Sequence, residues 1–355
     1  MASNAPSHAA DTEVQPVNIH RLVEIFELLG ADYVLVSAPN DSEADPETDT
    51  DADAAAAAPE DERIVLQTGL PHLTIHFDIQ DDTLSAFATW EGRFDASAEE
   101  TVAPIIADFN WQMVAPTLSY AFSDGQGKHP TEQIVINGNR AMAIGEGLSR
   151  NQLGTFILSV FGSFSAAFEA VAQAFPQAVT WNEEDSFMTE ATQQAPEFEN
   201  PYEFFSHTDL PAVTLERVIA SLNEDDFGAV AHPETPNMAV AQRNDLDWVF
   251  SITDELVRVE CVLPTELDFA EIAPVFHVIT NELNAAAFDG RALVGDVDGH
   301  AELRGDATFT AGPGMNDDQL FHALNYAVVA AQEALLGTLD NFNEFARTVQ
   351  ERDAE

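Results

Sequence analysis

Two hydrophobic periodicities alternate along this chain, one typical of helices and the other typical of strands. Apolar residues spaced i, i+3, i+4 and i+7 predict an amphipathic helix near the start, at Ile19, Leu22, Val23 and Phe26. The same stripe recurs in the second half at Leu215, Val218, Ile219 and Leu222. Two long apolar segments predict helices that pack on a core, Thr155 to Phe175 and Phe321 to Leu339.

Between these helices, apolar and polar residues alternate with a period of two, which predicts half-buried antiparallel strands. In the first half the alternating runs are Tyr33 to Val36, Ile64 to Gln67, Leu73 to Phe77, Leu84 to Trp90, Leu118 to Phe122 and Ile134 to Ile144. In the second half they are Met238 to Gln242, Trp248 to Ile252, Val257 to Leu263, Leu293 to Val297 and Ala301 to Phe309. A middle helix is predicted in each half, at Ala103 to Ile106 and Ala273 to Phe276. This order predicts an α+β unit whose helices gather on an antiparallel sheet.

The two halves are similar to each other. Gly147 to Leu153 aligns with Gly314 to Leu320, and the same offset carries Gly138-Asn139 onto Gly305-Asp306. The sequence offset between the first helices of the two halves is larger, because the first half carries the acidic insertion and extra loop residues. Internal similarity of this kind predicts two tandem copies of one unit, ordered α-β-β-β-α-β-β-α. We expect the copies to pack as a pseudo-dimer, since one chain holds both at high effective concentration.

Each aligned segment carries the signature of a helix start. Ser149 and Asn316 stand at N-cap positions, and the glutamine at the third position after each, Gln152 or Gln319, can return a hydrogen bond to the cap. The glycines before these caps predict turns, because a phosphate loop would also require a Gly-Lys-Ser/Thr ending. These turns are Gly145-Glu146-Gly147 and Gly312-Pro313-Gly314.

Two acidic segments divide the chain. Ala38 to Glu62 contains ten acids and no base, which predicts a disordered surface insertion, and Asn182 to Asp209 contains eight acids and no base. The second segment is predicted to be the linker between two domains. The predicted organisation is a disordered N-terminus (1–16), a first domain (17–181), the linker (182–209), a second domain (210–340) and a C-terminal tail that can be helical (341–355).

The linker differs from the insertion because it contains aromatic side chains. Each of them gains about 1.5–3 kcal/mol by leaving water. We therefore expect a cluster of four to dock into a groove, either on this protein or on a partner: Phe198, Tyr202, Phe204 and Phe205.

The charge of the chain disfavours two classes of partner. It has 62 acids and 13 bases, a formal net charge of −49, and Lys128 is its single lysine. Such a surface repels phosphates and anionic lipids, so nucleic acid and membrane are not expected partners. The acidity fits either a basic partner or a salty cytoplasm. The segment from Met1 to Gln15 lacks the basic and apolar regions of a secretory signal, so a cytoplasmic location is expected.

Several motifs together resemble the YbjN family. They are Phe109-Asn110 at the end of the middle helix, Pro116 to Tyr120 at the next strand, Asp124-Gly125 at the turn, and the Gly-Leu-Ser start of the last helix. The second half is similar through Asn281-Glu282-Leu283-Asn284 and Asp298-Gly299, but it lacks the proline after the asparagine motif. The family is labelled as bacterial sensory transduction regulators. The resemblance implies the fold of type III secretion chaperones, which bind client proteins as dimers.

No constellation of residues in the sequence predicts catalysis, a cofactor or a metal. His72 and His76 are four apart in an alternating run, and zinc would still need a third ligand. Cys261, the single cysteine, lies in an apolar run and is predicted to be a buried small hydrophobe. No Gly-x-Ser-x-Gly nucleophile elbow is present, and with 62 acids close carboxylate pairs occur by chance.

The resemblance favours a non-enzymatic protein-binding module, chaperone-like or regulatory, that acts as a monomer or a homodimer. Two alternatives remain open. An enzyme with its site between the two units would hold buried polar residues with perturbed pKa values in a closed pocket. A polyanion mimic would instead gather its acids on one curved face.

Overall fold

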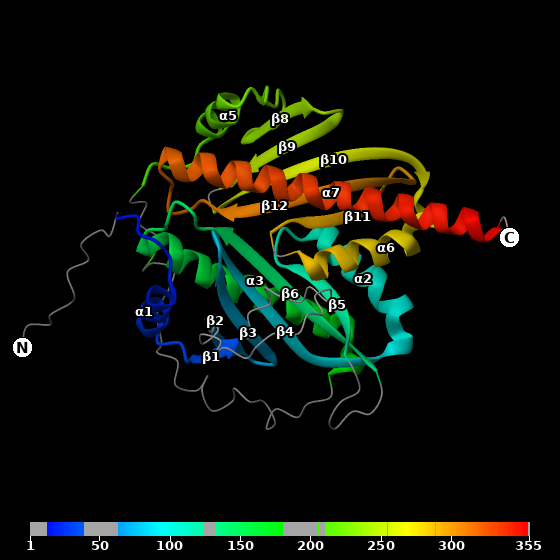
Figure 1. Ribbon diagram of the computed structural model, residues 1–355, viewed down its shortest axis with the longest axis horizontal. Coiled ribbons are helices and arrows are strands. Elements are labelled where there is room, and N and C mark those ends of the chain that lie inside the picture. Colours follow the sequence, from blue (N-terminus) through cyan, green and yellow to red (C-terminus); the bar gives the residue numbers. More distant parts are fainter. Residues whose placement is uncertain are drawn as a thin grey trace, which may run out of the picture.

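The computed structural model describes residues 13–38, 63–123, 132–179, 205, 210–253, 255–287 and 289–353. Within these residues the chain forms two antiparallel six-stranded sheets with helices packed on them. The predicted α+β class is therefore confirmed. In Figure 1 the first unit runs from blue to green and lies below the second, which runs from yellow-green to red.

The first unit begins with a helix and then builds its sheet. Its described elements, in chain order, are α1 (Ile19–Leu29), β1 (Val34–Ala38), β2 (Arg63–Leu70), β3 (Leu73–Gln80), β4 (Thr83–Asp95), η1 (Ala96–Ala98), α2 (Glu99–Gln112), β5 (Thr117–Ser123), β6 (Gln133–Ala143), α3 (Arg150–Ala174) and η2 (Pro176–Ala178). The sheet order is β1-β2-β3-β4-β6-β5.

The second unit repeats this order of elements. They are α5 (Leu215–Glu224), β7 (Val230–Ala231), β8 (Met238–Arg243), β9 (Leu246–Ile252), β10 (Leu256–Asp268), α6 (Phe269–Ala286), β11 (Arg291–Val297), β12 (His300–Thr310) and α7 (Asp317–Asp353). The sheet order is β7-β8-β9-β10-β12-β11, which matches the first sheet strand for strand. Each unit has four strands before its middle helix, one more than the predicted order of the unit. All four were predicted as alternating runs in the first half, but in the second half β7 is too short to show a period.

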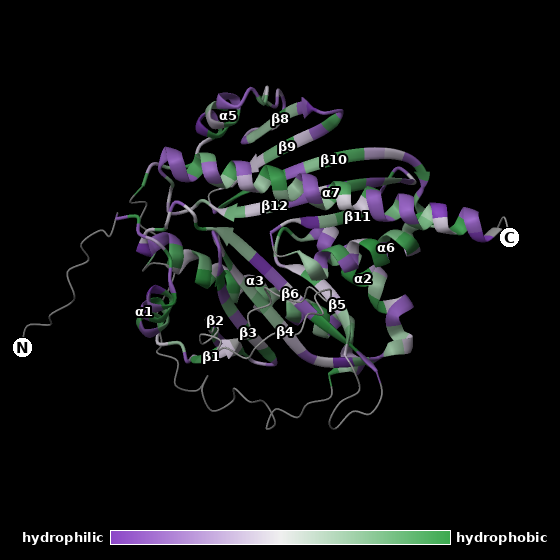
Figure 2. Ribbon diagram, viewed as in Figure 1, coloured by the Kyte–Doolittle hydropathy of each residue, from purple (hydrophilic) through white to green (hydrophobic). Residues whose placement is uncertain are grey.

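Each unit has its own hydrophobic core between its sheet and its helices. Helix α3 packs on β4 and β6, and α7 packs on β10, β11 and β12. The largest fully buried side chains of the two cores include Phe26, Phe77, Trp90 and Phe156 in the first unit and Trp248, Phe250 and Phe276 in the second. The predicted helix stripes face these cores through Leu22, Phe26, Val218 and Leu222. Figure 2 shows that hydrophilic residues become frequent toward the C-terminal end of α7.

Matching arginines hold the first helix of each unit to the start of the last helix. Arg21 donates to the carbonyl oxygens of Gln15, Pro16 and Leu148. Arg217, at the equivalent position of α5, donates to those of Pro211, Ala212 and Met315. Gln15 also forms an isolated β-bridge with Leu148, so ordered contacts begin before residue 17, the domain boundary expected from the sequence.

The acidic insertion lies outside the described residues, but the strand residues at its two ends are placed. Ala38 and Arg63 are opposite each other in the antiparallel pair of β1 and β2. Replacing residues 39–62 by an Asn-Gly turn should therefore close a normal hairpin. We expect the melting temperature to change by less than about 4 °C, measured by calorimetry. A drop of more than about 10 °C would show that the insertion stabilises the fold.

Candidate binding site between the two units

The units meet through a reciprocal pair of glutamines. The side-chain amide of Gln152 donates to the carbonyl oxygen of Gly314 at 2.8 Å, and that of Gln319 donates to the carbonyl oxygen of Gly147 at 2.9 Å. The two amides also contact each other, with N···O distances of 3.0 and 3.2 Å. Both glutamines are buried. Each contact is the counterpart of the other in the alignment of the two halves, which is the pattern of a two-fold interface.

The same glutamines complete the predicted helix caps. Gln152 accepts from the backbone N–H of Ser149, and the Ser149 hydroxyl accepts from the N–H of Gln152. Asn316 and Gln319 make the equivalent pair. The predicted capping boxes are therefore confirmed. Each glutamine donates to the other unit through its amino group, and its side-chain oxygen accepts both from its own cap residue and from the other glutamine.

Replacing Gln152 by alanine should lower the free energy of unfolding by about 1–3 kcal/mol, because the Gly314 carbonyl loses its donor inside the interface. Gln319→Ala should have a similar effect. The double variant should lose less than the sum of the two single effects, since the amides contact each other. Urea titrations would measure these differences. Gln112→Ala is the matched control, because its amide bonds Asp108 on an exposed helix face and should change stability by less than about 0.5 kcal/mol.

Asparagines join the middle helices to the neighbouring strands. Asn110 on α2 exchanges two hydrogen bonds with the backbone of Leu118, and Asn284 on α6 makes the same pair with Ala292. Asn281, also on α6, makes this pair across the interface with the backbone of Tyr120 on β5. Helix α6 thereby covers β5, the edge strand of the other sheet.

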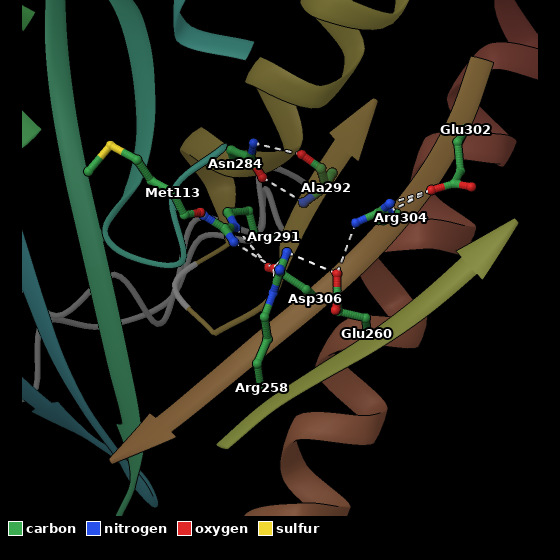
Figure 3. A network of polar contacts seen from close by, with 9 residues as sticks. All are labelled: Met113, Arg258, Glu260, Asn284, Arg291, Ala292, Glu302, Arg304 and Asp306. Carbon is green, nitrogen blue, oxygen red and sulfur yellow. Dashed lines mark hydrogen bonds and ion pairs between the residues drawn. The ribbon is translucent and has the colours of Figure 1, made fainter. Parts of the chain in front are cut away.

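A buried arginine and carboxylate network lies on the second unit's side of this interface (Figure 3). Asp306, 1% exposed, accepts from Arg291 at 2.7 Å and from Arg258 at 2.7 Å. Arg291 also donates to the carbonyl oxygen of Met113 in the first unit at 2.6 Å. The outer part of the network continues through Glu260 and Arg304 to Glu302.

The network fixes the charge of Asp306 and extends onto the first unit. Burial would raise the pKa of Asp306, but Arg291 and Arg258 outweigh that effect and hold the pKa below its ordinary value. Arg304 lies 4.1 Å from the ring centroid of Trp111 on α2, a cation–π distance. Arg291 and Arg304 therefore contact the first unit, while Asp306 and Glu260 pair with the arginines from within the second unit.

A cavity of about 680 Å³ opens between the units beside this network. The first unit contributes part of β6, one face of α3 and the α2–β5 loop, and the second contributes the start of β10 and the turn before α7. Its lining is mainly apolar and includes Met113, Leu158, Phe205, Leu256 and Pro313. Among the described residues, the polar lining consists of Arg140, Thr155, Ser159, Ser163, Thr310 and Glu255.

Arg140 is the cationic group of this cavity. It donates to the hydroxyl oxygens of Ser159 at 2.9 Å and Ser163 at 3.3 Å, and it lies 5.7 Å from the ring centroid of Phe156. Burial lowers the pKa of Arg140 to about 10, which still leaves the side chain charged at neutral pH. No carboxylate in the described part of the chain forms an ion pair with it.

Phe205 is the one predicted docking residue that the structure places. Its side chain is 2% exposed, belongs to the core of the first unit and contacts Gly154, where an added Cβ would lie 2.4 Å from the ring. Its carbonyl oxygen accepts a 3.4 Å hydrogen bond from Thr155. The other three predicted residues lie outside the described residues, namely Phe198, Tyr202 and Phe204.

The remaining sequence candidates have local explanations. His72 has a positive φ of 63° in the turn before β3 and pairs with Glu91 at 3.0 Å, whereas His76 lies within β3. Cys261 is fully buried, and burial raises its pKa to about 12. Among the described residues no cluster of three His, Cys, Asp or Glu side chains could hold a metal ion.

Helix α3 is long and apolar enough to span a membrane by length and composition. Many of its residues between Gln152 and Val171 are nevertheless buried, and it packs on β4 and β6. A buried core helix of a soluble α+β protein passes the same test of length and composition.

Comparisons with known proteins give similarities to solved structures and to no known family. No family model matches the sequence, and no curated protein matches it. The solved structure described as "YbjN, a putative transcription regulator from E. coli" is similar at 12% identity, with a TM-score of 0.31. The similarity covers 38% of this chain and 96% of that chain. The resemblance to the YbjN family stays a prediction.

Proposed function

We propose that this protein is a non-enzymatic binding module, chaperone-like or regulatory, in which two tandem YbjN-like units pack as a pseudo-dimer around a ligand cavity. The cavity carries this proposal, because its wall comes from both units and from Phe205 of the linker. A ligand bound there would contact both units and Phe205 at once. Its binding would therefore set how these parts are positioned relative to one another.

Three observations support a duplicated, paired unit. The two sheets have the same strand order, and the arginine contacts of α1 and α5 are equivalent. The Gln152 and Gln319 contacts are reciprocal across the interface. A unit that pairs with its own copy in this way buries the face that a homodimer of single units would share.

The polar lining of the cavity supports binding in preference to catalysis. The enzyme alternative expects buried polar groups with perturbed pKa values between the units, and Arg140 meets that description. An arginine is charged at neutral pH and is not a general base. The hydroxyls of Ser159 and Ser163 accept from it, and the described residues of the lining include no histidine that could activate them. The arrangement suits holding an anion.

We further propose that the linker aromatics contact a protein partner in the cytoplasm, and that occupancy of the cavity sets whether they are available. Phe205 joins the two features, because it is part of the linker and part of the cavity wall. The strong acidity disfavours nucleic acid and membrane as partners.

Limited proteolysis of the full chain tests this proposal. Cleavage between Asn200 and Phe205 should be slower in wild type than in Phe205→Ala, by about tenfold or more, because a docked segment must open before it is cut. Phe345→Ala is the matched control, since Phe345 is 45% exposed on α7. Extract of the source cells should slow cleavage of wild type further. Equal and prompt cleavage of all three chains, unchanged by extract, would contradict the proposal.

A further inference from the structure

Side chains at equivalent positions of the two units differ in size at the interface. Thr155 and Ser159 line the cavity, and the alignment of the two halves places His322 and Tyr326 at the equivalent positions. The Tyr326 hydroxyl is 2.9 Å from the hydroxyl of Thr83, across the interface. The His322 ring lies against Gly145, where an added Cβ would be 3.0 Å from Nε2. Large side chains therefore occupy the second position, whereas small hydroxyl side chains leave the first one open.

The open side also carries a charge that the filled side lacks. Arg140 corresponds to Ala307 in the same alignment. In the described part of the chain, Nε and Nη2 of Arg140 have no protein acceptor, and its two hydrogen bonds go to neutral hydroxyls. A partly buried cation that forms no ion pair is unfavourable, so an anion that reaches Arg140 would be strongly attracted.

We propose that the cavity binds a small monocarboxylic acid with an apolar body, its carboxylate on Arg140 and its body against the apolar wall. The guanidinium presents two parallel N–H donors, a geometry that matches one carboxylate. The apolar body would contact Leu158, Phe205 and Leu256. This inference rests on the proposed function and names the chemical class of the ligand.

The charge and size of the cavity select against other anions. Glu255 also lines the wall and the chain carries a net charge of −49, so a second negative charge on the ligand would be repelled. A volume of about 680 Å³ is in the range of pockets that enclose a whole small molecule. A single glutamate side chain of the linker would leave most of this space empty.

Calorimetric titration of the full chain with decanoate, against decanol as the neutral probe, tests the proposal. We expect one decanoate per chain and an affinity at least about tenfold higher than that for decanol, since a charge-assisted hydrogen bond contributes about that factor. Arg140→Gln should make the two probes bind alike. Ser159→Tyr should weaken both by at least about tenfold, because it places in the cavity the side chain that fills the equivalent position.

Tyr326→Phe is the matched control, since it alters the filled side and should leave decanoate binding unchanged. Circular dichroism must show that each variant remains folded. Equal affinity for decanoate and decanol in wild type, or unchanged binding in folded Ser159→Tyr, would overturn the proposal. Decanoate binding that appears only after Glu199→Gln and Glu203→Gln would also overturn it, because the linker would then be the occupant. If decanoate does not bind but another small molecule is retained in the cavity, the carboxylate proposal is overturned. The proposed binding function would still hold.

Discussion

Asp306→Asn is expected to lower the free energy of unfolding by about 3–5 kcal/mol, because it leaves the buried Arg291 and Arg258 without their shared counter-charge. Asp306 is 1% exposed and Arg291 is 2% exposed, so water cannot replace the lost carboxylate. Urea titration followed by circular dichroism measures the change. Glu302→Gln is the matched control: its partner Arg304 is more accessible to solvent, and we expect a loss below about 1 kcal/mol.

The pH dependence of this difference has a definite sign. The folded-state pKa of Asp306 lies below its ordinary value, so its stabilising effect is complete above the unfolded-state pKa of about 4. The effect is lost as the pH falls through the folded-state pKa. Wild type and Asp306→Asn should therefore differ fully at pH 7 and converge in acid. A difference below about 1 kcal/mol at pH 7 would show that the network does not stabilise the folded chain.

Gly305→Ala is expected to destabilise the second unit by about 3 kcal/mol or more, at or beyond the upper end of ordinary overpacking. An added Cβ at Gly305 would lie 1.8 Å from the carbonyl oxygen of Ala331, so the backbone of α7 would have to move away from β12. The equivalent residue of the first unit, Gly138, gives the matched control. There the nearest atom belongs to the side chain of Phe168 at 3.1 Å, and the ring can shift.

We expect Gly138→Ala to change the free energy of unfolding by about 1 kcal/mol or less. Both variants can be compared with wild type by the same urea titration. Equal effects at the two positions would mean that α3 and α7 pack on their sheets in the same way, contrary to the structure. The comparison is informative because Gly138 and Gly305 are equivalent in sequence and differ in what lies above them.

Local patterns were sufficient to predict most of the fold. The i, i+3, i+4, i+7 stripes of α1 and α5 place Leu22 and Val218 in the cores, and the alternating runs give every described strand except β7. The capping boxes at Ser149 and Asn316 are present. These features depend on neighbours within a few residues, which a sequence displays directly.

Contacts between distant residues could not be read in this way. Gln152 and Gln319 were recognised as cap residues, but their second hydrogen bonds require knowledge of which helix starts meet. The contacts of Arg291 with Asp306 and Met113 could not be predicted for the same reason, since they join residues that are distant in the sequence. The alternating pattern of Val257 to Leu263 gave no sign that Arg258 and Glu260 join a buried network.

One signal for the cavity was present in the sequence. When the two halves are aligned on Gly147 and Gly314, Ser159 corresponds to Tyr326 and Arg140 to Ala307. An exchange of size and charge between aligned positions is what the proposed ligand site leads us to expect. This exchange indicates a cavity only once the interface is known. On an exposed face, the same difference in side chains would open no cavity. The structure places Phe205 in the wall of this cavity, and the docking of the four linker aromatics stays a prediction.

Native mass spectrometry of the full chain tests the central claim most directly. The protein would be isolated under native conditions from the cells that produce it, and compared with Ser159→Tyr isolated in the same way. We predict that wild type carries one small molecule per chain and that folded Ser159→Tyr carries none. Wild type and Ser159→Tyr chains that both show only their ligand-free masses, after exposure to the same cell extract, would contradict the account.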